Sequence, residues 1–323
     1  MILLRRGDRL PAVAMAQRVI NMCIARDNRL QAIMPLGEDG DFGPLTQQRI
    51  TDAAQALGVS GSRTGQLDSH LWSVIKDIAQ VRVVDVIDLC VAVKVEKLGL
   101  GSLHSYLPGY LSRNEPGLNQ RQTRQRIAAI IRQVRSDAVS SRAHWGRLVA
   151  AGGQPIALTD HRNPFAQIAR EIRERSRNGW QVCLLRVQGH GSSASQGIAG
   201  SLLGWNSISH DDIVFDRDDS WDEVFRMSRI SGMSHDMPRW GVVELHGCKI
   251  ASRRRRREEG RVVHYDGPQY VRDFAQLLQR PVSAGVRNNM YGSSRTDYRI
   301  EGRVVSHTPG NRTLGDYFAA NPA

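Results

Sequence analysis

The sequence has little of what marks secreted, membrane-spanning or metal-rich proteins. Its 323 residues include only four cysteines, which are scattered and form no CxxC pair. That number is too small for a disulfide framework, and the spacing argues against a zinc ribbon. No apolar run reaches the roughly 18 residues of a membrane-spanning helix, and the opening residues lack the basic-then-apolar order of a secretory signal. We therefore expect a reduced protein without a membrane span or a signal peptide.

Lysine is also scarce. Only four of the 44 basic residues are lysines, and the formal net charge is +12. A basic surplus is one feature of nucleic-acid-binding proteins. The arginines concentrate after the first 76 residues, with eight between positions 113 and 147, but no aromatic platform or recognition motif accompanies them. A nucleic-acid-associated protein is therefore the weakest of three functional interpretations, and we do not expect nucleic acid as a partner.

The length, with 41% apolar and 24% charged residues, predicts a globular chain of two domains or of one large domain with an appendage. Apolar periodicity predicts a helix over Ala12–Ile24 and a second over Leu45–Leu57. Between them lies a turn-rich stretch with two glycines that supply backbone freedom. Its chemistry-bearing residues are Asp39, Gly40, Asp41, Phe42 and Gly43, followed by Thr46 near the start of the second helix.

This DGxFGxxT pattern resembles the peptidoglycan-binding domain, a three-helix module of cell-wall hydrolases. Further matching residues are Leu3 or Leu4, Gly7, Val13, Gln17, Ile50, Leu57, Gly58, Val59 and Trp72. The chain departs from the family at Ala53 and Ala54, where a Phe-Gln pair is usual, and in a degraded turn near residues 64–68. The resemblance implies a mainly α module at residues 1–76 that binds peptidoglycan through the loop. The alternative is a packing module that has lost its ligand.

The region 77–160 is expected to be a connecting, largely helical one. The β-branched run Val81–Val95 fits a buried strand or an apolar helix, and periodicity does not choose between them. A helix is predicted over Gln120–Ser136, with an apolar stripe and a solvated basic face.

Residues 161–323 alternate helical and strand patterns, which predicts an α/β domain with a mostly parallel sheet. A strand at Trp180–Val187 leads to His190, and a strand at Trp240–Leu245 leads to Cys248. Sites form beyond the carboxyl ends of parallel strands, so an imidazole and a thiol are expected to face each other there. Backbone N–H groups near Gly191 or Gly247 are candidates to bind an oxyanion.

This arrangement resembles the caspase-like (clan CD) cysteine peptidases, in which a His-Gly after one strand and a Cys after the next form the dyad. The residues that carry the likeness, to a largely uncharacterised bacterial family, are Gly189-His190-Gly191 and His246-Gly247-Cys248-Lys249-Ile250-Ala251. It covers about residues 160–318 and implies a catalytic His190 and a nucleophilic Cys248. An inert or ligand-sensing caspase-like domain is the alternative. Cys23 and Cys183 lie within apolar patterns and are predicted to be packing residues.

Three neighbouring features are weighed against this dyad. Asp211, Asp212 and His246 are candidates to line a substrate pocket. Asp211 and Asp212 belong to an acidic stretch, which a solvated loop would also explain. A zinc site built from His190, His246 and Cys248 lacks a fourth ligand, so no metal and no cofactor is expected. The run Arg253–Arg257 is predicted to be a solvated, mobile loop.

Together these patterns predict a mainly α N-terminal module followed by a caspase-like α/β domain. The function expected is a cell-wall-associated cysteine hydrolase that cleaves a peptide or amide bond, with peptidoglycan and a peptide or protein substrate as partners. The alternative is a non-catalytic binding protein with an inert caspase-like domain. Without a visible signal, a bacterial cytoplasmic origin is expected, with delivery to the periplasm or wall by a specialised route.

Overall fold

The structure is a computed structural model that describes residues 4–59, 65–150, 153–159, 163–189, 191–197, 207–209, 221–258, 261–287, 300 and 303–323. At its centre is a six-stranded sheet in the order β11-β10-β7-β3-β1-β2. The strands are β1 (Val81–Asp88), β2 (Ile156–Leu158), β3 (Gln181–Gln188), β7 (Val242–His246), β10 (Val282–Gly285) and β11 (Val304–His307). All pair in parallel except β11, which is antiparallel to β10. The expected α/β architecture with a mostly parallel sheet is confirmed.

The sheet begins well before residue 161, where the α/β domain was expected to start. β1 is a central strand, and β2 forms one edge. The ambiguous run from Val81 to Val95 is a strand up to Asp88 and a helix from Cys90. The Asp88 carboxylate accepts a hydrogen bond from the backbone N–H of Cys90 at 3.0 Å, and this Asx turn holds the junction between the strand and the helix.

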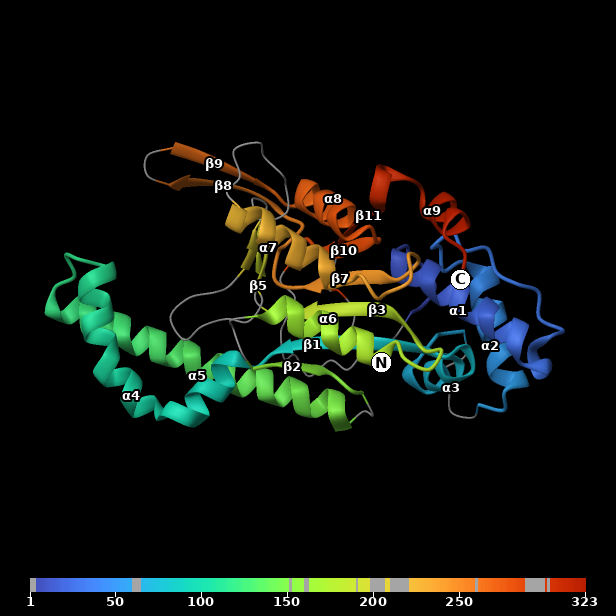
Figure 1. Cartoon of the computed structure of the whole chain (residues 1–323), viewed down its shortest axis with the longest axis horizontal. Helices are drawn as coiled ribbons and strands as arrows, with labels where there is room; N and C mark the ends of the chain where they lie inside the picture. The colour runs from blue at the N-terminus through green and yellow to red at the C-terminus, as the bar shows by residue number, and fades with distance from the viewer. Residues whose placement is uncertain are drawn as a thin grey trace.

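Apolar side chains on one face of the sheet are covered by three helices, α6 (Pro164–Arg175), α7 (Trp221–Gly232) and α8 (Gly267–Leu278) (Figure 1). Ile168, Ile230 and Phe274 are fully buried there against the sheet. Each of these helices follows or precedes a parallel strand, as crossover connections require. The opposite face meets helix α1 (Pro11–Arg26) at β3 and β7, and helix α5 (Gln120–Ala150) at β1.

The N-terminal helices α1, α2 (Pro44–Ala56) and α3 (Ser69–Ala79) share their core with the sheet instead of standing apart from it. The same apolar cluster contains residues of these helices together with Cys183 of β3, Trp240 shortly before β7 and Phe318 near the carboxyl terminus. Phe42, expected to fill the core of this module, is 1% exposed. Residues 4–79 therefore stabilise the sheet directly.

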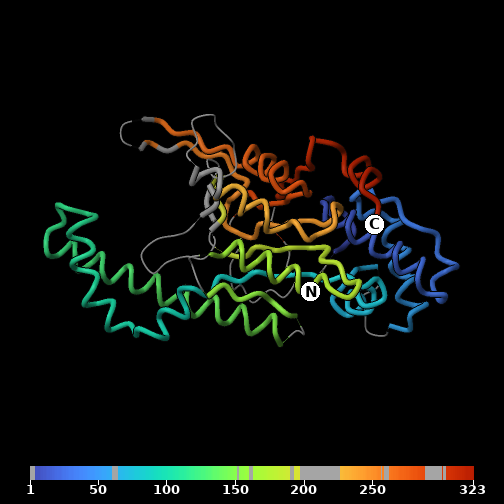
Figure 2. Tube along the Cα trace, viewed as in Figure 1, coloured from blue at the N-terminus to red at the C-terminus, as the bar shows by residue number. Residues whose placement is uncertain are grey.

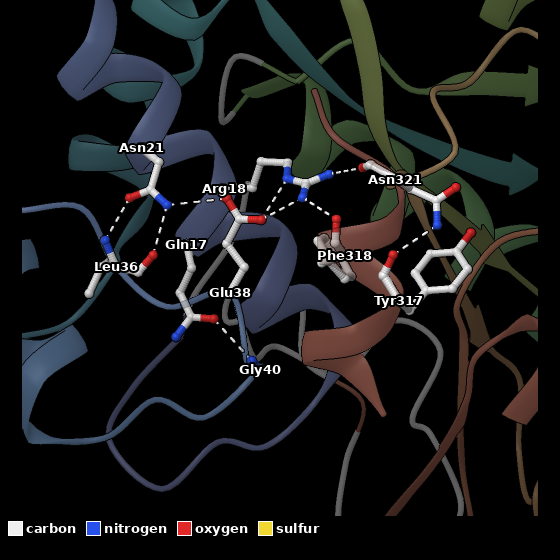
Figure 3. Close-up of polar contacts among 9 residues, drawn as sticks. All are labelled: Gln17, Arg18, Asn21, Leu36, Glu38, Gly40, Tyr317, Phe318 and Asn321. Atoms are coloured by element: carbon white, nitrogen blue, oxygen red, sulfur yellow. Dashed lines mark hydrogen bonds and ion pairs between the residues drawn. The ribbon is translucent and has the colours of Figure 1, made fainter. Parts of the chain in front are cut away.

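Arg18 of α1 ties this module to the last helix, α9 (Leu314–Ala320) (Figure 3). Its guanidinium bonds the Glu38 carboxylate at 2.8 Å, donates to the carbonyl oxygen of Phe318 at 2.6 Å and also donates to that of Asn321. The ring of Phe318 lies 5.0 Å from the guanidinium carbon. A buried cation with this many partners fixes how the two ends of the chain meet.

Helices α4 (Cys90–Asn114) and α5 form a hairpin that projects from the sheet (Figure 2). α4 is kinked at Gly99, whose φ of 72° is in the left-handed region. The hairpin has a small core of its own, centred on Leu103, Leu107 and Val134. α5 continues 14 residues past the predicted end at Ser136, and its arginines 121, 124, 132 and 135 are exposed, as predicted.

The arginine run was wrongly predicted as a loop. It is strand β8 (Arg253–Glu258), paired antiparallel with β9 (Arg261–Asp266) in a two-stranded hairpin (Figure 1). The β-forming residues that support the pairing are on the other strand, where Tyr265 packs against the main core. A separate small sheet joins β4 (Gly191–Ser192), β5 (Ser195–Gly197) and β6 (Ser207–Ser209).

Candidate functional site

The predicted dyad residues follow two strands that are neighbours in the sheet. β3 and β7 pair in parallel, and Gln188 is the register partner of His246. His190 and Cys248 are each two residues further along the chain from these partners. Adjacent strands lie about 4.8 Å apart. His190 itself lies outside the described residues.

Cys248 differs from the other three cysteines, and all four lie in the described part of the chain. Cys23, Cys90 and Cys183 are buried, whereas Cys248 is half-buried. Burial raises the pKa of the Cys23 and Cys183 thiols to about 12, which keeps them protonated. Both residues pack in the core, as predicted from their apolar surroundings. Cys248 is thus the cysteine best placed to meet a substrate.

The turn that carries Cys248 is anchored to the chain that follows β10. The backbone N–H of Lys249 donates to the carbonyl oxygen of Arg287 at 3.0 Å, and that of Ala251 donates to the oxygen of Gly285 at 3.0 Å. Lys249 has a φ of 57°, which is uncommon for a residue with a side chain. The turn is therefore held in a defined, bent conformation directly beyond the strand end.

The other predicted site residues are distributed as follows. Gly247 is buried next to Cys248, and Gly191 pairs with Gln196 in β4 and β5. Asp211 and Asp212 lie outside the described residues. His246 is buried, and its Nε2 donates to the Glu244 carboxylate at 2.9 Å. No group of three or more His, Cys, Asp or Glu side chains suited to a metal ion occurs in the described ranges.

A row of polar residues that was not predicted from the sequence crosses the sheet close to the carboxyl ends of β3 and β7. Its members are register partners on five successive strands: Asp85, Arg186, Glu244, Ser283 and Ser306. The first four are buried, with Ser283 at 0% exposure. Strands of a parallel sheet covered on both faces normally read as continuous apolar runs. The sequence did contain a signal for this row, because one charged residue interrupts each of the apolar runs VVDVI, LLRV and VVEL.

The polar row continues into a hydrogen-bonded network that ends at helix α5. Nε of Arg186 lies 2.8 Å from Oδ1 of Asp85, and its Nη2 donates to Oδ2 at 3.0 Å. Nε2 of Gln188 donates to Oδ1 of Asp85 at 2.6 Å, and Nε2 of His144 donates to Oε1 of Gln188. This network fixes the carboxyl end of β3, two residues before His190.

Two pKa values in this network are shifted. Burial favours the neutral form of Asp85 and is the largest single influence on it, but the Arg186 guanidinium together with other nearby positive charges holds the pKa of the carboxyl below its usual value. Burial lowers the pKa of His144. Asp85 is therefore ionised and His144 neutral at pH 7.

In the N-terminal loop, the polar groups of the DGxFGxxT pattern bond mainly to Gln17 of α1. Nε2 of Gln17 donates to Oδ1 of Asp39 at 2.9 Å and to Oγ1 of Thr46 at 3.2 Å. Its Oε1 accepts from the N–H of Gly40 at 3.0 Å (Figure 3). Asp41 forms an ion pair with Arg9 at 2.9 Å, and Gly43 precedes α2. These residues hold the loop on α1.

None of the helices in the described residues is long and apolar enough to cross a membrane. Comparison of the chain with protein-family models, with curated proteins and with solved structures gives no match.

Proposed function

We propose that the protein is a cysteine hydrolase that cleaves a peptide or amide bond, with Cys248 as nucleophile and His190 as general base. The observation that carries the proposal is the register of β3 and β7. Gln188 pairs with His246, so the two chain segments that lead to His190 and Cys248 leave neighbouring parallel strands at the same edge of the sheet.

The chemistry needs a thiol that is accessible and an imidazole that accepts its proton. The half-buried Cys248 meets the first need better than the buried Cys23, Cys90 and Cys183. The thiolate attacks the carbonyl carbon, and the imidazolium then donates its proton to the leaving amine. Water hydrolyses the resulting thioester, with the imidazole again acting as base. Backbone N–H groups of the bent turn around Gly247 and Cys248 are the proposed donors to the oxyanion.

The direct test is hydrolysis of a library of peptidyl-coumarin amides in which the residue before the scissile bond varies. Wild-type protein is expected to release coumarin from a subset, and Cys248→Ser and His190→Ala each to lose at least about 99% of that rate. His104→Ala, an exposed histidine of α4, is the matched control and is expected to keep it. Turnover that survives Cys248→Ser would contradict the proposal.

For the N-terminal module, the proposal is peptidoglycan binding. It is supported by three helices with the DGxFGxxT loop between the first two, although Gln17 occupies much of the loop's polar surface. Cosedimentation with insoluble peptidoglycan tests it. The full chain is expected to sediment with the polymer and to remain in solution without it. Recovery in the supernatant at every polymer concentration would leave the module with its packing role alone.

A further inference from the structure

A cavity lies at the opposite end of the sheet from Cys248. It has a volume of about 270 Å³ and is lined by residues from α3, from the start of β1, from the end of α6 and from the segment before β3. β1 spans eight residues, so its two ends are about 23 Å apart. The cavity is therefore separate from the proposed dyad, and an inference about it does not depend on the proposed function.

The lining is rich in cations. Lys76, Arg82 and Arg175 all border the cavity. One carboxylate, Asp77, also borders the cavity and pairs with Lys76 at 3.2 Å, and Arg175 pairs with Glu171 at 2.5 Å. Arg82 has no carboxylate partner among the described residues, and its guanidinium carbon instead lies 4.4 Å from the ring centroid of Trp180. One half-buried positive charge is thus left for a ligand to neutralise.

Hydroxyl groups border the same cavity. Ser69 and Ser73, three residues before and one residue after Trp72 in α3, contribute them to the lining. Trp72 borders the cavity as well, but its side chain is 1% exposed and its Nε1 is buried, so this N–H is out of reach of a ligand. The two hydroxyl groups and the Arg82 guanidinium all suit an acceptor oxygen.

We propose that this cavity binds a small organic anion. A carboxylate or phosphate group of the ligand bonds to the Arg82 guanidinium, with the Ser69 and Ser73 hydroxyl groups as further donors in the lining, and a ring of sugar or aromatic size packs against Trp180. Guanidinium and hydroxyl groups are both hydrogen-bond donors, and two oxygens of a carboxylate or phosphate match the fork of the guanidinium. A volume of about 270 Å³ is just below the range of drug-sized sites, which favours a ligand with a single ring.

The test uses the full chain labelled with ¹⁵N and follows its six tryptophan indole N–H signals by NMR. Trp180→Phe assigns the signal of Trp180. Phenyl phosphate and benzoate are the charged probes, one for each oxyanion, and phenol is the neutral control of the same ring. Saturable movement of the Trp180 signal with phenyl phosphate or benzoate, but not with phenol, is expected. The more effective of the two identifies the preferred anion.

Arg82→Gln is the decisive variant, because it removes the charge but keeps a side chain of similar reach. It is expected to weaken binding at least tenfold, roughly the effect of losing one charged hydrogen bond. Arg173→Gln, on the exposed face of α6 outside the cavity, is the matched control and is expected to bind like wild type. An unmoved Trp180 signal with both anions, or equal binding by Arg82→Gln and wild type, would overturn the proposal.

Discussion

At the carboxyl ends of β1 and β3, the buried side chains of Asp85, Arg186 and Gln188 bond to one another. At the amino ends of the same strands, the half-buried guanidinium of Arg82 has no carboxylate partner among the described residues and lies against the ring of Trp180. The difference teaches that the charged groups at the two ends of the sheet serve different purposes. The paired groups support the strand ends that lead to the proposed dyad, and we propose that the unpaired Arg82 meets a ligand.

The largest expected effect follows from removing one member of the satisfied network. Asp85→Ala leaves the Arg186 guanidinium, which is 1% exposed, without its carboxylate. Breaking a buried ion pair in this way costs about 3–5 kcal/mol in the free energy of unfolding. Urea denaturation measures it. The matched change at the other end of the sheet, Asp77→Ala, removes an exposed pair with Lys76 and should cost less than about 1 kcal/mol. Equal losses of stability for Asp85→Ala and Asp77→Ala would contradict the difference between the two ends of the sheet.

The second effect is a pH dependence of stability at the carboxyl end. The folded-state pKa of His144 is lowered by burial, so the unfolded state takes up a proton first as the pH falls. Stability is therefore full above about pH 7, near which an unfolded histidine begins to titrate, and falls as the pH drops through that range. The pKa of the half-buried His307 is lowered by burial too and adds to the same fall.

Urea denaturation between about pH 8 and pH 5 measures this dependence. His144→Gln keeps an amide donor for Gln188 and is expected to flatten part of the pH profile, with His307→Gln flattening the rest. Asp85 acts in a different range: its lowered pKa makes its contribution full above about pH 4, and the contribution is lost as the pH falls further. An identical profile for wild type and His144→Gln would show that this imidazole is not held neutral by burial.

The smallest expected effect is at the amino end. Arg82→Gln removes the contact between a guanidinium and the ring of Trp180, which is worth about 0.5–1 kcal/mol at a partly exposed site. Thermal unfolding of the ligand-free protein should therefore hardly change, while anion binding is lost. A large destabilisation instead would mean that Arg82 is a structural residue like Arg186, and the two ends of the sheet would no longer differ.

Much of the fold could be predicted from local pattern. β3 and β7 begin one and two residues after the predicted strands, because short apolar runs bounded by turns are local signals. The strand character of Arg253–Arg257 could not be seen, since it arises from pairing with residues 261–266. Register across strands was likewise invisible, so Asp85, Arg186 and Glu244 read as separate interruptions and not as one row.

For the candidate site, the sequence identified the segments but not what supports them. The glycines beside His190 and Cys248 marked the strand ends, and the adjacency of β3 and β7 agrees with that prediction. His246 was expected beside a substrate, whereas the structure pairs it with Glu244 in the strand. His144 was not predicted as a site residue. Its contact depends on how α5 packs against the end of β3, where Gln188 lies more than 40 residues further along the chain.

The most direct measurement of the central claim is the rate at which iodoacetamide alkylates Cys248 from about pH 5 to pH 9, read by mass spectrometry of each cysteine peptide. A thiol activated by an imidazole reacts well below the ordinary cysteine pKa of about 8.5. We predict fast alkylation of Cys248 near pH 6 that is lost in His190→Ala, with no label at that position in Cys248→Ser. A profile for Cys248 that follows an ordinary thiol and is unchanged by His190→Ala would contradict the account.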